Sequence, residues 1–226
     1  MKRFYTHVTV TDDGGILLDG RPVKTPARAP LRLPNVQLAE AVAAEWRAQT
    51  DDILPQTMPL TGLANAALDR VAPEHAAFAA GLAQYGETEL LCYRADSPPE
   101  LVARQAERWD PLLDWARQRY DVAFHVVTGI MHQPQPAATI TRLAHEVAAI
   151  PAPALAALSP IITIGGSLVI GLALFEEAVL PEDAFALAHL DELWQAECWG
   201  EDDWALAARD ARKRDFLAAC RFLELL

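Results

Sequence analysis

The sequence predicts an α+β protein, with a small β-rich N-terminal domain followed by a larger, all-helical C-terminal domain. Two patterns support this fold class. Residues 4–33 are rich in β-branched and aromatic residues and in glycine turn signals. Apolar residues then recur at helical spacing from about residue 36 nearly to the C-terminus. About a fifth of the chain is alanine, the best helix former, which favours many helices.

The N-terminal domain is expected to contain a small antiparallel meander of three or four strands. Asp12-Asp13-Gly14-Gly15 and Asp19-Gly20 are the turn signals that separate its first strands. The segments with strand-like composition are 4–10, 16–18, the residues around Val23, and 31–33.

A helix should follow the meander, because Asn35 is a suitable N-cap and apolar residues at helical spacing come after it. Pro55 and Pro59 then interrupt the chain. We therefore place the N-terminal domain at residues 1–57 and the helical domain at residues 58–226.

The helical domain is expected to hold a long helix that begins at Pro98-Pro99, with further helices before and after it. A short strand is predicted at 124–127. The other predicted helices are 61–71, 73–85, 137–149, 159–178, 182–198 and 203–225.

One uncharged segment, residues 147–175, is long enough to cross a bilayer. Prolines interrupt its first half, and only Ile161–Phe175 remains apolar after the last of them. Apolar runs of that length are more often buried helices than membrane spans. We therefore predict a buried central helix, with Ser159 as its N-cap and Pro160 as its first residue.

The composition restricts the classes of partner and the compartment. The 226 residues include 19 Lys and Arg against 31 Asp and Glu, a net charge of −12. Such a surface repels phosphate backbones and anionic lipid, so no nucleic acid partner and no stable membrane insertion are expected. Three widely spaced cysteines without a C-x-x-C motif imply neither a disulfide framework nor a thiolate zinc site. Since no signal or transit peptide is recognisable, a cytoplasmic protein is expected.

No catalytic constellation is recognisable. The chain lacks the G-x-x-x-x-G-K-[ST] loop, the G-x-S-x-G motif and any Glu-x-x-His pair. Asp110 and Asp114 lie four residues apart, but nearby arginines favour a solvated charged face over acid–base catalysis. Cys92 lies among apolar residues and is expected in the core. We expect no catalytic residue, no metal and no cofactor.

The unusual part of the chain is residues 190–204, which contain three tryptophans among six acidic residues. Tryptophans buried in a helical core are one interpretation of this pattern. A contact surface is the other, because aromatic anchors ringed by polar groups are typical of interface hot spots.

Several long motifs resemble one known family in the same order along nearly the whole chain: Phe4-Tyr5, the segment Leu18–Pro26, Trp46, Met58–Asn65, Glu87–Tyr93, Trp109–Leu113, and Leu190-Asp191-Glu192 with Gln195, Glu197 and Trp199-Gly200. The chain resembles the ATP synthase F(1) complex assembly factor 2 family, chaperones dedicated to the alpha subunit of the catalytic head. The sequence is similar to a bacterial member.

The resemblance implies a non-enzymatic chaperone that binds the unassembled alpha subunit until a beta subunit displaces it. Separately, we expect the chain to be monomeric. The resemblance also implies an N-terminal β-containing domain and a helical C-terminal domain. An acidic position near the C-terminus is important in the family and falls here on Asp191 or Glu192. The implied partner-binding residues are Asp191, Glu192, Gln195, Glu197, Trp199 and Gly200. Two other function classes stay open: a nucleotide- or metal-dependent enzyme, and a membrane-associated assembly factor that uses Ile161–Phe175.

Overall fold

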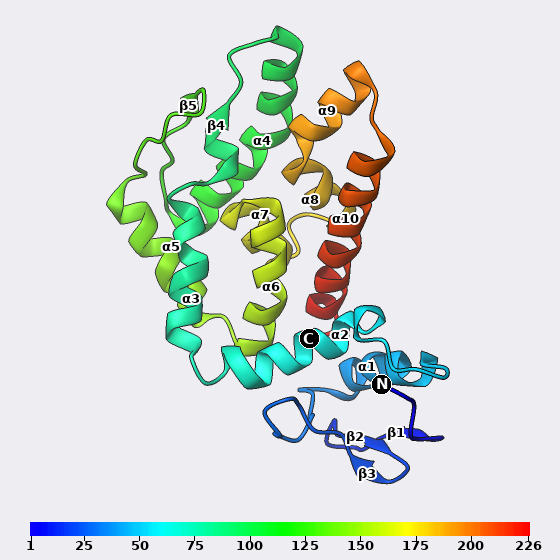
Figure 1. Ribbon diagram of the computed structural model, residues 1–226. Coiled ribbons are helices and arrows are strands. Elements are labelled where there is room, and N and C mark those ends of the chain that lie inside the picture. The colour runs from blue at the N-terminus through cyan, green and yellow to red at the C-terminus, as the bar shows by residue number, and fades with distance from the viewer. The chain divides into compact units, whose positions relative to one another are not determined.

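Contacts between residues divide the chain into two units, which are described separately (Figure 1). The computed structural model covers residues 1–226. The first unit comprises residues 1–75, 151–157 and 218–226, and the second comprises 76–150 and 158–217. The first unit includes the N-terminal domain expected at residues 1–57 and extends beyond it. The expected boundary between residues 57 and 58 stays a prediction about which parts fold on their own.

The first unit begins with the expected antiparallel meander, which has three strands in the order β1-β2-β3. These strands are β1 (Val8–Val10), β2 (Ile16–Leu18) and β3 (Arg21–Pro22). Leu18 pairs with Arg21, so Asp19 and Gly20 form the two-residue hairpin turn that the sequence predicts. A fourth strand at 31–33 does not form, because Arg32 makes only an isolated bridge to Gly15.

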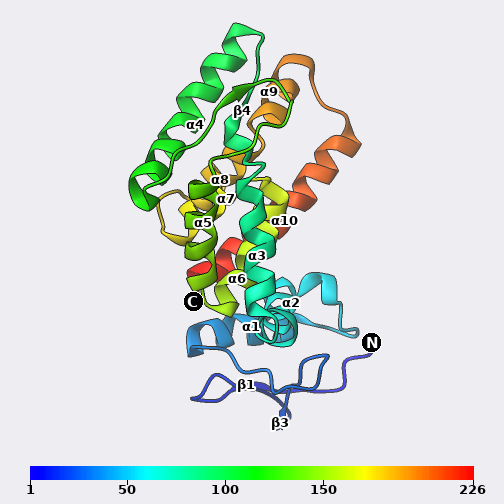
Figure 2. The ribbon, with the colours of Figure 1, turned by 90° about the vertical axis from the view of Figure 1, so that its left-hand side faces the viewer.

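Helix α1 (Val36–Ala48) packs on this sheet, as Figures 1 and 2 show. Its expected cap is confirmed, because the Asn35 side chain accepts a hydrogen bond of 2.8 Å from the backbone N–H of Leu38. Leu38 and Val42 are fully buried in the core that the helix shares with the strands. Helix α2 (Pro59–Ala66) follows and continues into a π-helical turn at Ala67–Val71.

The second unit is helical apart from one parallel pair of two-residue strands, β4 (Tyr93–Arg94) and β5 (Val127–Thr128). The long helix predicted after Pro98 is α4, and the helix predicted at 137–149 is α5 with those bounds. The helices are α3 (His75–Ala83), α4 (Pro99–Tyr120), α5 (Ala137–Ala149), α6 (Ala152–Gly165), α7 (Leu168–Phe175), α8 (Pro181–Ala188), α9 (Leu190–Trp199) and α10 (Asp203–Glu224), of which α3, α6 and α10 contribute residues to both units. A small antiparallel sheet followed by mostly helical sequence confirms the α+β class.

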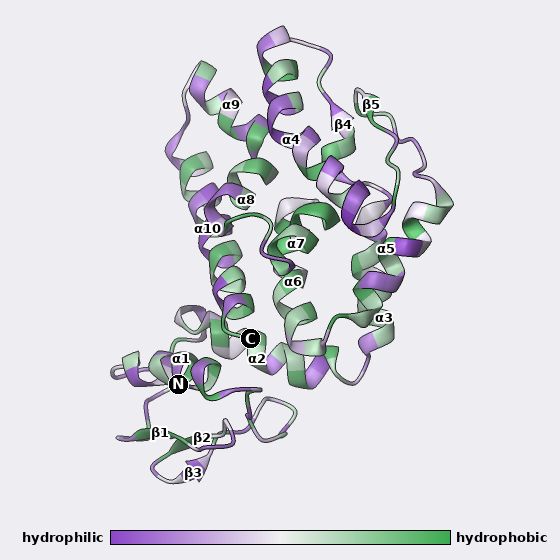
Figure 3. Cartoon of the chain, turned by 180° about the vertical axis from the view of Figure 1, so that it is seen from behind, coloured by the Kyte–Doolittle hydropathy of each residue, from purple (hydrophilic) through white to green (hydrophobic).

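The central helix predicted at 159–178 is wrong, because α6 and α7 are separate helices. Pro160 lies inside α6 instead of starting a helix, and the chain breaks at Gly166. Gly166 has a φ of +66°, which favours glycine, and its N–H bonds to the Ile162 carbonyl to end α6. Ser167 then caps α7 by accepting from the N–H of Ile170 at 3.0 Å. The central position is confirmed: residues 168–174 are buried, and Figure 3 shows α7 as hydrophobic along its length.

Three other predicted elements need correction. The helix predicted at 182–198 is two helices, because His189 leaves the helical conformation between α8 and α9. The strand predicted at 124–127 is β5, which begins only at Val127. The helix predicted at 73–85 is α3 followed by a 3₁₀ turn at Gln84–Gly86.

Candidate functional site

Helix α9 carries five of the six predicted partner-binding residues, and the sixth, Gly200, is its C-cap. Leu190 and Trp194 lie one helical turn apart and are both buried. The acidic residues Asp191 and Glu192 occupy the first turn, where they favour the positive end of the helix dipole. Because one face of α9 is anchored, Gln195 and the residues from Glu197 to Gly200 are exposed to solvent.

Asp191 is held in position by a buried side chain of α4. The Gln105 side-chain Nε2 donates to Asp191 Oδ1 at 2.8 Å, and the Gln105 Oε1 accepts from the backbone N–H of Ala95 at 2.8 Å. Gln105 is only 1% exposed, so both ends of its amide are fixed inside the protein. The carboxylate of Asp191 therefore has a defined orientation at the edge of the core, and Gln105 engages only its Oδ1.

Glu192 and Glu197 form ion pairs at the surface. Both carboxylate oxygens of Glu192 accept from Arg212 Nη2 on α10 at 2.7 Å. Glu197 Oε2 lies 2.6 Å from Arg104 Nη1 on α4. The four side chains are between 38% and 59% exposed, and ion pairs at the surface contribute about 0–1 kcal/mol each. Breaking either ion pair therefore costs little free energy.

Two large aromatic side chains are exposed where α9 ends. Trp199 is 74% exposed and Trp204, at the start of α10, is 88% exposed. Trp199 is oriented by an edge contact with buried Trp194, with ring centroids 5.5 Å apart. Gly200 ends α9 with a φ of +79°, a conformation that favours glycine, and its N–H bonds to the Ala196 carbonyl at 2.9 Å. Figure 1 shows the segment that connects α9 to α10.

We call these exposed side chains the tryptophan–acid surface: Glu192, Gln195, Glu197, Trp199 and Trp204. The core interpretation of the tryptophan-rich segment is confirmed for Trp194, whereas Trp199 and Trp204 face solvent, and the contact surface stays a prediction. Two residues of the candidate site, Trp204 and Gln105, are not among the six that the sequence predicts. Trp204 was recognisable from the sequence, but Gln105 is 86 residues from Asp191 and only the fold brings them together.

The groups tested for catalysis have ordinary structural environments. Asp110 pairs with Arg94 at 2.8 Å and Asp114 with Arg117 at 2.6 Å, which confirms the predicted charged face. Cys92 is fully buried as predicted, and burial raises the pKa of its thiol to about 12. No group of three or more His, Cys, Asp or Glu side chains is arranged to hold a metal ion. No helix has the length and apolar character needed to cross a membrane.

Comparison with known proteins places the chain in a family. The family model described as ATP12 chaperone protein matches residues 2–117, half of the chain. The chain belongs to the ATP12 chaperone family. Membership of a chaperone family implies a protein that works without catalysis, and it supports a role in ATP synthase assembly.

ATP12 relatives match over most of their length. The chain is 24% identical over 214 residues to the mitochondrial protein atp12 of Schizosaccharomyces pombe, covering 88% of this chain and 74% of that protein. The crystal structure of Atp12 from Paracoccus denitrificans is 41% identical with a TM-score of 0.92, covering 99% of this chain and 97% of that one. A mutant of the Paracoccus protein with lysine in place of an aspartate gives 42% identity and a TM-score of 0.93 over the same shares. The resemblance read from the sequence motifs is thereby confirmed, and so is the ATP12 fold.

Proposed function

We propose that this chain binds the unassembled alpha subunit of the ATP synthase catalytic head and covers its interface until a beta subunit takes its place. An alpha subunit without its neighbour exposes a large apolar interface, and exposed surfaces of that kind aggregate. A protein that binds the exposed surface lowers the concentration of the aggregating species by mass action, without nucleotide hydrolysis. Family membership supports this function, as does the mixed aromatic and acidic character of the tryptophan–acid surface.

The observation that carries the proposal is the exposure of Trp199 and Trp204 beside acidic side chains. Exposed tryptophans are rare on a surface that only solvent contacts, and tryptophan is the residue most enriched among interface hot spots. The surrounding carboxylates would steer the surface toward a basic patch on the alpha subunit and speed the encounter more than they raise affinity. Moderate affinity suits a chaperone that an authentic neighbour must displace.

The partner-binding residues that we propose are Asp191, Glu192, Gln195, Glu197, Trp199 and Gly200. Of the two candidate acids, Asp191 fits the key role better. Gln105 fixes one of its oxygens and leaves Oδ2 for the partner, whereas Arg212 occupies both oxygens of Glu192. Gly200 contributes by turning the chain after Trp199.

The same proposal includes the setting in which the chain acts. We propose a monomer that works in the bacterial cytoplasm without a cofactor. The net charge of −12 supports this setting, because it favours solubility and discourages adsorption to nucleic acid or anionic membranes.

Co-expression tests the function. An alpha subunit produced with this chain should be soluble to a level at least about tenfold higher than when produced alone, because the covered interface cannot aggregate. The soluble alpha subunit should also co-purify with a tag on this chain. An unrelated protein of similar size and net charge is the control. Equal solubility with and without this chain, together with no co-purification, contradicts the proposed function.

A further inference from the structure

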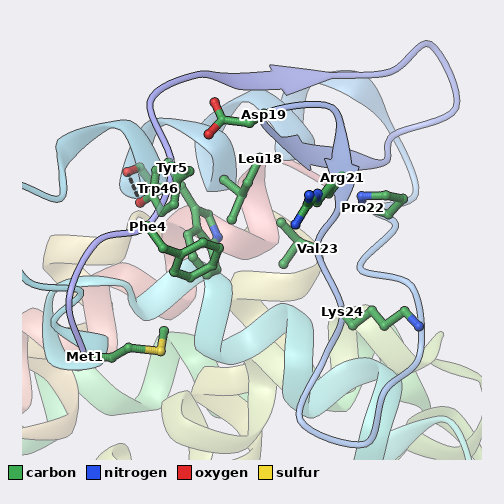
Figure 4. Close-up of a pocket in the computed structure, with 10 residues that line it drawn as sticks. All are labelled: Met1, Phe4, Tyr5, Leu18, Asp19, Arg21, Pro22, Val23, Lys24 and Trp46. Carbon is green, nitrogen blue, oxygen red and sulfur yellow. Dashed lines mark hydrogen bonds between the residues drawn. The ribbon is translucent and has the colours of Figure 1, made fainter.

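The first unit contains a cavity of about 600 Å³ that the tryptophan–acid surface does not use. The N-terminal segment, the β2–β3 hairpin and α1 surround it (Figure 4). Figure 4 shows Phe4, Leu18, Val23 and Trp46 pointing toward one another within it. Its volume lies within the range of about 300–1,000 Å³ that is typical of ligand pockets.

Trp46, one of the residues that line this cavity, has a ring that is held firmly in place. The indole Nε1–H of Trp46 is buried and donates no hydrogen bond. The ring is held in place, because Tyr5 packs against it with centroids 5.8 Å apart and donates its hydroxyl to the Trp46 carbonyl at 2.7 Å. Because Nε1 is enclosed by protein atoms, an occupant of the cavity meets the apolar ring of Trp46 and not its N–H.

The rim of the cavity is positive. Arg21 and Lys24 are both exposed, and neither takes part in an ion pair within 4.0 Å. Asp19 is the acidic residue that also lines the cavity, but its carboxylate already accepts from the backbone N–H groups of Thr6 and His7, at 3.1 and 2.7 Å. In a chain with a net charge of −12, two unpaired cations at the mouth of an apolar cavity favour an anionic occupant.

We propose that this cavity binds an extended acidic segment of a client polypeptide. An apolar side chain of the segment fills the space between Leu18, Val23 and Trp46, and flanking carboxylates pair with Arg21 and Lys24. The choice of a polypeptide rests on the proposed function, because a chaperone acts on polypeptide chains. The site belongs to the first unit and is distinct from the residues of α9, so the two surfaces can be tested separately.

Titration of the full chain with short peptides tests this site. The probe is an acetylated, amidated pentapeptide with a central leucine between pairs of glutamates. The readout is the ¹⁵N–¹H resonance of the Trp46 indole, assigned by its absence in Trp46→Phe. We expect a saturable shift with this peptide, and a response at least about tenfold weaker when lysines replace its glutamates or glycine replaces its leucine.

Reversing the two positive charges at the rim is the second test of the proposed site. The double variant Arg21→Glu with Lys24→Glu should bind the acidic peptide at least about tenfold more weakly than the native chain. Arg28→Glu with Arg70→Glu is the matched control, because it changes the net charge of the first unit equally at two other exposed arginines, and it should leave binding within about twofold.

Three results would overturn the site: no shift at millimolar peptide, an equal response to the basic peptide, or a response to decanoate with none to the peptides. The titration does not depend on which client is natural. A failed titration beside successful co-expression therefore overturns this site alone, and the reverse pattern overturns the proposed function alone.

Discussion

Replacing Glu89 by alanine is expected to lower the free energy of unfolding by about 4 kcal/mol at pH 6. The side chain of Glu89 is fully buried and reaches the N-terminus of α7. Its carboxylate accepts from the Ser167 hydroxyl, and from the backbone N–H groups of Val169 at 3.0 Å and Leu91 at 3.3 Å. Alanine leaves these buried donors without an acceptor, at about 1–3 kcal/mol for each one that finds no other partner, and adds a cavity. Urea unfolding followed by circular dichroism measures the change.

The pH dependence of stability separates the charge of Glu89 from its packing. Burial raises the pKa of this carboxyl to about 7, against the opposing effect of its hydrogen bonds. Because the folded pKa is higher than the unfolded one, the stabilisation is complete below about pH 4.5 and is lost as the pH rises through about 7. The raised pKa of Glu89 therefore changes the free energy of unfolding by about 3 kcal/mol over this pH range.

Glu89→Gln is the matched control, because it keeps an acceptor and cannot ionise. Its stability relative to the native chain should rise by about 3 kcal/mol between pH 4 and pH 8. Parallel pH profiles for the two proteins, or an alanine variant as stable as the native chain, would contradict this role of Glu89.

The second large effect is expected at the tryptophan–acid surface. Trp199→Ala with Glu197→Lys should weaken binding of the alpha subunit at least roughly 30-fold, about 2 kcal/mol, because the change removes an exposed aromatic anchor and reverses a rim charge. Both side chains are exposed, so the fold should be unchanged. Biolayer interferometry with immobilised chain measures the affinity, and circular dichroism checks the fold.

The matched control is Ile130→Ala with Glu74→Lys, which removes another exposed apolar side chain and reverses another exposed acid outside α9. This control should bind the alpha subunit as the native chain does. Equal affinity of the native chain and the α9 variant would show that binding uses a different surface. Asp191→Asn is the finer test of the key acid, since it keeps an acceptor for Gln105 while removing the charge.

Local signals predicted those parts of the fold that short-range chemistry controls. The Asp19-Gly20 turn and the Asn35 cap act within a few residues, and both form as expected. The break between α6 and α7 combines local features at Gly166 and Ser167 with a distant one, because Glu89, 78 residues from Ser167, accepts from the Ser167 hydroxyl. Pro160 was misread as a helix start, since local preference does not show that tertiary packing supports a proline inside a helix.

The candidate site also has some features that local sequence predicts and others that depend on distant contacts. Composition identified the tryptophan-rich acidic segment, and helical spacing places Leu190 and Trp194 on one face. Which tryptophan is buried depends on the turn at Gly200 and on packing against α4, so the exposure of Trp199 could not be read from the sequence. The support of Asp191 by Gln105 depends on the contact between α4 and α9, and no local pattern signals it.

Displacement by the beta subunit is the most direct test of a chaperone that holds the alpha subunit non-covalently. A purified complex of this chain with the alpha subunit should release the chain when beta subunit is added, without nucleotide hydrolysis, and size-exclusion chromatography should then show an alpha–beta species and free chain. A complex that persists with excess beta subunit, or whose release requires nucleotide hydrolysis, would contradict this mechanism.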